Sequence, residues 1–245
     1  MLDHIKDLAD RCYRKNIYTY SEFLSVDEIS DFLSSSRDFS YVPYTLWGGF
    51  EESERKLVRF GSSDMLGYEE SFPISVLEVS PLMDKFADEL GHRDFLGALM
   101  NLGIDRNVIG DIVVESPRAY FFVLDSMAEY VMENLTRVKH TSIMIKKLET
   151  LPALKSKEPC AVAIQIPSER PDVIIGRVYN MSRDAAGKMF KEGKVFVNGR
   201  VCESNSKTLK INDVVTVRGC GRFSYLGSTS VSKKGKLNAT VSVWK

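Results

Sequence analysis

The sequence predicts an α+β protein. Helical patterns occupy residues 1–35, strands and helices alternate between residues 71 and 166, and a helix followed by a hairpin lies within residues 182–201. At 245 residues the chain is long enough for two or three domains. We expect a small N-terminal α/β region at 1–70, a middle domain at 71–166 and a C-terminal domain at 167–245.

The formal net charge of zero conceals an uneven distribution of charge along the chain. From Ile166 to Lys245 there are 15 Lys and Arg against 6 Asp and Glu, whereas residues 1–165 hold 18 basic and 27 acidic residues. Such asymmetry indicates that the basic part meets a polyanion while the acidic part has another task. The alternative is that the two parts simply attract each other.

Composition argues against several classes of protein. No run of 18 apolar residues occurs, so no membrane span is expected, and acidic residues near the N-terminus argue against a signal peptide. The four cysteines are scattered and there are three histidines, so we expect reduced thiols and neither a metal nor a cofactor. These features are typical of a cytoplasmic protein.

The N-terminal region begins with two expected helices. Residues 2–16 place apolar side chains at helical spacing, and the second helix starts after Ser25, which forms a capping box with Glu28. Residues 51–60 fit a helical turn or a flexible loop equally well.

The middle domain has the predicted order strand, helix, strand, strand, helix, strand. The strands lie within residues 72–80, 110–124 (two strands around a turn at 115–118), 141–149 and 159–167, and the helices within 92–104 and 125–138. This is the split βαβ order of RRM-like and ferredoxin-like sheets. RRM sheets stack bases on exposed aromatic residues, and Tyr120, Phe121 and Phe122 are the candidates here. Adjacent residues alternate faces, so some of the three must be core.

The C-terminal domain starts with two short helices. The second helix begins at its N-cap Ser182, ends at Gly193 and carries an apolar stripe, while Asn198-Gly199 favours a type I′ hairpin. The stripe consists of Ala185, Ala186, Met189 and Phe190. Arg183, Lys188 and Lys191 then face solvent or a ligand.

These residues resemble the S4 RNA-binding domain. The motif is carried by Arg170, Asp172, Ser182-Arg183, Ala186, Gly193, Val195, Val197-Asn198-Gly199, Val201, Asp213-Val214 and Arg218. Pro171 departs from the apolar residue that such domains usually place there, which affects the expected start of the first helix. A second resemblance, to YlmH-type ribosome-associated proteins of bacteria, covers nearly the whole chain. It is carried by residues 48–60, 92–114 and 218–245.

The resemblance implies an N-terminal region, an RRM-like middle domain and a C-terminal S4 domain. It implies a non-enzymatic, monomeric protein that binds ribosomal RNA or tRNA on the large ribosomal subunit, in rescue of obstructed subunits that hold peptidyl-tRNA. It also implies a link to cell division through gene neighbourhood, and cyanobacterial and plastid relatives are linked to photosystem assembly.

The expected RNA-binding residues are mostly cations of the C-terminal domain, which suit the phosphates of a folded RNA. The free N–H groups at the start of the helix at Ser182 add a phosphate site beside Arg183. The full set is Arg170, Ser182, Arg183, Lys188, Lys191, Lys194, Arg200, Arg218, Arg222, Lys233, Lys234 and Lys236. Candidates for a second RNA contact are Arg55, Lys56 and Arg59.

Two other classes of function remain as alternatives. The first is a protein-interaction scaffold in cell division or membrane-complex assembly. The second is an RNA-modifying enzyme, but P-loop, nucleophile-elbow and H-E-x-x-H motifs are all missing from the sequence. His92-Arg93-Asp94 looks like a kinase triplet, yet Leu99 stands where the catalytic loop needs Asn. We therefore expect no catalytic site and no small-molecule substrate.

Overall fold

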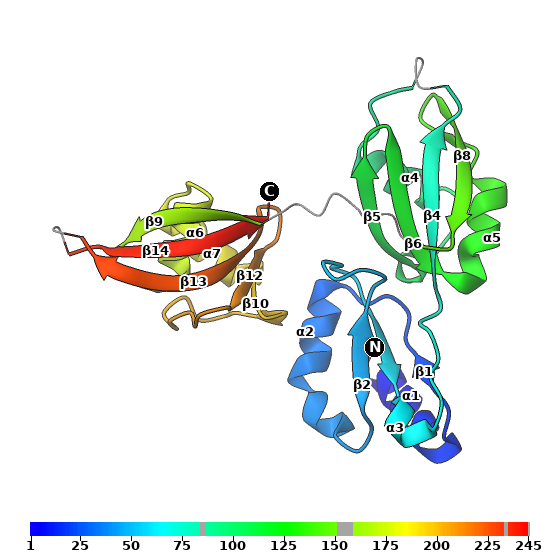
Figure 1. Cartoon of the computed structure of the whole chain (residues 1–245), viewed down its shortest axis with the longest axis horizontal. Coiled ribbons are helices and arrows are strands. Elements are labelled where there is room, and N and C mark those ends of the chain that lie inside the picture. The colour runs from blue at the N-terminus through cyan, green and yellow to red at the C-terminus, as the bar shows by residue number, and fades with distance from the viewer. Residues whose placement is uncertain (84–86, 151–158, 233–234, 245) are drawn as a thin grey trace. The chain divides into compact units, whose positions relative to one another are not determined.

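A computed structural model of the chain describes residues 1–83, 87–150, 159–232 and 235–244. The chain divides into two compact units, Met1–Lys155 and Ser156–Lys245. Each unit combines helices with antiparallel sheet, so the α+β class is confirmed (Figure 1). Within the described residues, no helix is both long and apolar enough to cross a membrane.

The N-terminal region of the first unit is a three-stranded sheet in the order β1-β3-β2 with helices packed on it. Its elements are α1 (Leu2–Lys15), β1 (Thr19–Tyr20), α2 (Val26–Ser34), η1 (Ser36–Phe39), β2 (Tyr44–Trp47), β3 (Leu57–Phe60) and α3 (Ser63–Leu66). Both expected helices are present, and the capping box holds because Ser25 N–H donates to the Glu28 carboxylate at 2.8 Å. The segment that the sequence left open, 51–60, ends in a strand because Val58 and Phe60 join the buried core with Phe32.

The middle of the chain forms a five-stranded antiparallel sheet in the order β5-β6-β4-β8-β7. Its elements are β4 (Ile74–Pro81), α4 (His92–Met100), η3 (Arg106–Val108), β5 (Ile109–Glu115), β6 (Arg118–Leu124), α5 (Asp125–Asn134), β7 (Arg137–Val138) and β8 (Thr141–Leu148). The first and third long strands, β4 and β6, are adjacent in the centre, which is the split βαβ arrangement.

The two faces of this sheet have different partners. Helices α4 and α5 cover one face, where Phe121 packs in a core with Phe95 of α4 and Val131 of α5 (Figure 1). On the other face, Tyr120 and Phe122 pack with apolar residues of the N-terminal region. The alternation of faces that the sequence implied is therefore present. The second face is covered at Tyr120 and Phe122, whereas Met144 of β8 on the same face is 41% exposed.

The second unit is a six-stranded antiparallel sheet in the order β11-β10-β12-β13-β14-β9, with two helices packed on it (Figure 1). Its elements are β9 (Cys160–Ile166), α6 (Pro171–Val178), α7 (Arg183–Lys191), β10 (Val195–Val197), β11 (Arg200–Val201), β12 (Val214–Val217), β13 (Gly221–Val231) and β14 (Leu237–Trp244). Pro171 is the first residue of α6, a position where the missing N–H costs nothing.

The place of β9 corrects the expected boundary of the middle domain at residue 166. Strand β9 pairs with β14 along its whole length, from Cys160 opposite Val243 to Ile166 opposite Leu237. Its inward residues Ile164 and Ile166 belong to the core beneath α6 and α7. The local pattern of β9 is compatible with the sheet of the middle domain and with that of the second unit. In the structure β9 pairs with the long strand β14 of the second unit.

Candidate nucleic-acid interface

Helix α7 presents three cations to solvent because its opposite side is buried. Ser182 Oγ accepts a hydrogen bond of 3.1 Å from the N–H of Ala185, so Ser182 is the N-cap that the sequence predicted. Ala186 and Phe190 are buried in the core. The exposed side chains on the outer side are Arg183, Lys188 and Lys191.

A buried carboxylate connects the starts of α6 and α7. Asp172 is 2% exposed and accepts two hydrogen bonds of 3.0 Å from Arg170, through Nε and Nη2. The same carboxylate lies 3.5 Å from Nε of Arg183, whose side chain is 70% exposed. One buried acid thus positions two guanidinium groups at the surface, and an Arg held in place loses less entropy when it binds phosphate.

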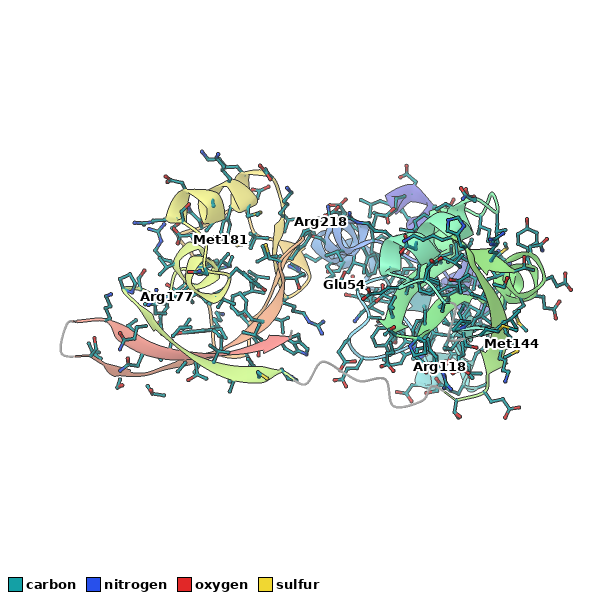
Figure 2. All side chains as sticks on the ribbon, turned by 90° about the horizontal axis from the view of Figure 1, so that it is seen from above. Glu54, Arg118, Met144, Arg177, Met181 and Arg218 are labelled. Atoms are coloured by element: carbon teal, nitrogen blue, oxygen red, sulfur yellow. The ribbon has the colours of Figure 1, made fainter. Side chains whose placement is uncertain are left out.

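A second group of cations lies at the ends of the strands. The Arg218 N–H donates to the Lys194 carbonyl at 2.9 Å, so these two residues are neighbours at adjoining ends of β10 and β12. The Arg218 guanidinium lies 5.7 Å from the ring centre of Phe196, and Arg222 stacks 4.7 Å from that of Trp244. Figure 2 labels Arg218 just beyond β12 and Met181 between the two helices.

The remaining C-terminal candidates are spread along the sheet. Arg200 follows the hairpin and pairs in register with Val197, while the Lys236 N–H donates to Ser232 Oγ near the β13–β14 turn. Lys194 forms an ion pair of 2.7 Å with Glu192. Lys233 and Lys234 lie outside the described residues.

The residues Asn198-Gly199 form the hairpin turn between β10 and β11, and both have positive φ. The Asn198 side chain donates to Asp213 at 2.8 Å and accepts from the N–H of Val214 at 2.9 Å. These bonds tie the hairpin to β12, which gives Asn198 a structural role.

The three candidates for a second RNA contact are engaged within the first unit. Arg55 donates to the carbonyl oxygens of Ile109 at 3.0 Å and Phe23 at 2.8 Å, and burial lowers its pKa. Arg59 pairs with Glu69 at 3.0 Å, and its side chain is 12% exposed. Lys56 joins Leu24 in a backbone bridge. Arg55 and Arg59 hold the fold together, and we leave all three residues out of the proposed interface.

The aromatic residues that were candidates for base stacking on the middle sheet are buried in this structure. Tyr120 is 5% exposed and Phe122 is fully buried, because Phe23 and Leu57 of the N-terminal region pack on them. The backbone of β5 also lies close to the N-terminal region, since a Cβ on Gly110 would lie 2.6 Å from the Phe23 ring. The aromatic residues singled out in the sequence therefore serve the junction inside the first unit.

Among the described residues, no group of three or more His, Cys, Asp and Glu is arranged to hold a metal ion. Sequence reasoning missed one exposed cation of the helical layer, Arg177 in the last turn of α6 (Figure 2). It lies within the S4-like motif, and the burial of Ile174 and Ile175 on the same helix marks its side as the outer one.

Comparison with known proteins gives a match to the middle of the chain. Residues 68–151 match a family described as the putative RNA-binding domain in YlmH. Over these residues the chain is similar to that family, and we refer to residues 68–151 as the YlmH-type domain. The chain is also 28% identical over 198 residues to ribosome-associated protein quality control protein P2 of Bacillus subtilis (strain 168). The aligned region covers 79% of this chain and 75% of the relative.

A solved structure described as cell division protein ylmH from Streptococcus pneumoniae is 20% identical, with a TM-score of 0.48, over 60% of this chain and 88% of that one. The family match and the curated relative confirm the resemblance to YlmH-type proteins that the sequence indicated. The YlmH-type domain ends at residue 151, so the S4 character of the second unit stays a prediction.

Proposed function

We propose that this protein is a non-enzymatic, cytoplasmic and monomeric RNA-binding protein of ribosome-associated quality control. It binds ribosomal RNA or tRNA on the large ribosomal subunit through the second unit, which we interpret as an S4-type domain. The match to the putative RNA-binding domain in YlmH supports RNA binding, and the relative named ribosome-associated protein quality control protein P2 supports ribosome association.

The observation that carries the proposal is the Asp172 centre at the start of α6 and α7. Its two arginines, Arg170 and Arg183, stand beside the exposed lysines of α7. The N-terminus of α7 adds partial positive charge next to Arg183. This combination binds the backbone of a folded RNA by charge and shape.

The proposed interface extends from this centre to the strand cations. It comprises Arg170, Ser182, Arg183, Lys188, Lys191, Lys194, Arg200, Arg218, Arg222 and Lys236 of the described residues, together with Lys233 and Lys234.

The test is binding of the full chain to purified large and, separately, small ribosomal subunits over a series of salt concentrations. In the variant Arg183→Glu/Lys191→Glu we expect weaker binding and a slope of log K against log salt that is smaller by about 2. The matched control is Lys6→Glu/Arg11→Glu, which reverses two exposed charges on α1. Equal binding by the two variants would contradict the site, and binding to small subunits alone would contradict the partner.

A further inference from the structure

The helical side of the YlmH-type domain carries an open groove of about 570 Å³. One wall is α4 with the residues that follow it, and the other is the end of α5 with β7 and the turn after it. The polar and small residues that line it include Arg93, Asp94, Gly97 and Asn101 on the first wall and Asn134, Arg137 and Lys139 on the second.

The groove has an excess of positive charge. Lys139 forms an ion pair of 2.8 Å with Asp94, which links the two walls. Arg93 on one wall and Arg137 on the other are both exposed, and no carboxylate among the described residues lies within ion-pair distance of either. Arg137 donates through Nη2 to the carbonyl oxygen of His140 at 3.4 Å, which leaves its other N–H groups for an anionic ligand. Together with Arg93 it gives the groove two cations in an acidic part of the chain.

Packing within the described part of the chain does not require a glycine at position 97 of the groove. Gly97 lies inside α4, where glycine is less favourable than alanine because of its backbone entropy. A Cβ at Gly97 would meet nothing within 4 Å, so no neighbour in the described part of the chain excludes a side chain. A bare helix wall allows a ligand to approach the backbone closely.

Polar groups suited to a nucleobase line the same groove. Asn134 donates through Nδ2 to the carbonyl of Tyr130 at 2.8 Å, which fixes the amide and leaves its oxygen to accept. Asn101 is exposed on the opposite wall. Amides read the edges of unpaired bases, and arginines bind the adjoining phosphates.

We propose that the YlmH-type domain binds a single-stranded RNA segment in this groove, on its helical side, and not on its sheet. On the sheet face that RRM domains use, the aromatic residues Tyr120 and Phe122 are buried against Phe23 and Leu57, as described above. Arg93 and Arg137 take phosphates, the two amides take base edges, and Gly97 makes room for the strand. This proposal rests on the proposed function and gives the protein a second RNA contact, separate from the Asp172 centre.

The test is photo-crosslinking of the full chain to oligouridine that contains 4-thiouridine, with the crosslinked peptides identified by mass spectrometry. We expect crosslinks in residues 92–101 and 134–139. They should fall about tenfold in Arg93→Glu/Arg137→Glu, and the salt slope of oligouridine binding should decrease by about 1.4, the share of two phosphate contacts with a single strand. Lys6→Glu/Arg11→Glu is the charge-matched control and should crosslink like the wild type.

A pair of substitutions at Gly97 separates filling of the groove from loss of the fold. Gly97→Gln should abolish the crosslinks by occupying the space, whereas Gly97→Ala should retain them, and both should keep or raise Tm because each residue favours helix more than glycine. If both variants retained the crosslinks, the role of the groove would be overturned.

The outcomes distinguish this proposal from the proposed function. Crosslinks confined to residues 159–244 would overturn the groove and leave the C-terminal site standing, and crosslinks in residues 118–124 would overturn it in favour of the sheet. Persistence of the groove crosslinks in Arg183→Glu/Lys191→Glu would support two separate contacts. Equal displacement of the RNA by polyglutamate at the same charge concentration would overturn RNA as the ligand, and absence of all RNA binding would overturn both proposals.

Discussion

Arg170 donates two hydrogen bonds of 3.0 Å to the carboxylate of Asp172, which is 2% exposed. The pair is unequal, since the Arg170 side chain is 33% exposed while the acid is inside the fold. A buried acid with this partner stabilises the start of α6 and at the same time orients a cation at the surface. The same pair thus contributes to the stability of the second unit and to the proposed RNA interface.

Replacement of Asp172 distinguishes the effect of net charge on RNA binding from the effect of holding Arg170 and Arg183 in position. Asp172→Asn adds one net positive charge, so binding governed by charge alone would become tighter. We expect weaker binding to large ribosomal subunits, by about 1–3 kcal/mol, because Arg170 and Arg183 lose the acceptor that orders them. Titration at fixed salt measures this, with circular dichroism as the check on folding, and tighter binding would show that position does not matter.

The Asn198 turn should matter for stability and not for RNA. Asn198→Ala removes two side-chain hydrogen bonds and places alanine at φ 51°, so we expect a loss of about 1–3 kcal/mol in the free energy of unfolding of the second unit. The salt slope of RNA binding should be unchanged. Urea denaturation and the salt series test the two halves of this prediction, and a changed slope would assign Asn198 to the interface.

Arg55 should behave as a structural residue although it is a cation. Arg55→Lys keeps the charge but cannot reach the carbonyls of Ile109, Phe23 and Arg106 with one planar group, so we expect the first unit to lose about 2–4 kcal/mol. The matched control is Arg14→Lys on α1, where the side chain is 78% exposed. Equal stability of the two variants in urea denaturation would contradict the structural role.

Acid should destabilise the second unit partly through Glu169. Hydrogen bonds from Tyr225 at 2.6 Å and Ser228 at 2.7 Å hold the pKa of Glu169 below its ordinary value of 4.5. A lowered folded-state pKa gives stability that is present above pH 4.5 and is lost as the pH falls through the folded-state pKa.

Glu169→Gln removes this contribution. The variant should be less stable than the wild type at pH 7, and the difference in Tm should shrink as the pH falls from 5 to about 3. Thermal unfolding at several pH values measures it. A difference in Tm that does not depend on pH would show that the hydrogen bonds alone, and not the charge, stabilise the unit.

The sequence predicted the local elements well because their signals lie within a few residues of each other. The Ser25–Glu28 capping box, the Ser182 N-cap and the turn at Asn198-Gly199 each use hydrogen bonds or backbone angles of near neighbours. The cations of α7 were predictable for the same reason, since the period of the helix separates them from its apolar stripe.

The sequence by itself thus determined the α+β class, the helix boundaries within a few residues and the excess of charge in the C-terminal part. Only the tertiary structure decided that β9 pairs with β14, that Phe23 covers Phe122, and that Arg93 and Arg137 share a groove. These relationships join residues far apart in the chain. Several strands have similar apolar alternation, so the choice among partners depends on the packing of the whole unit and not on any local pattern.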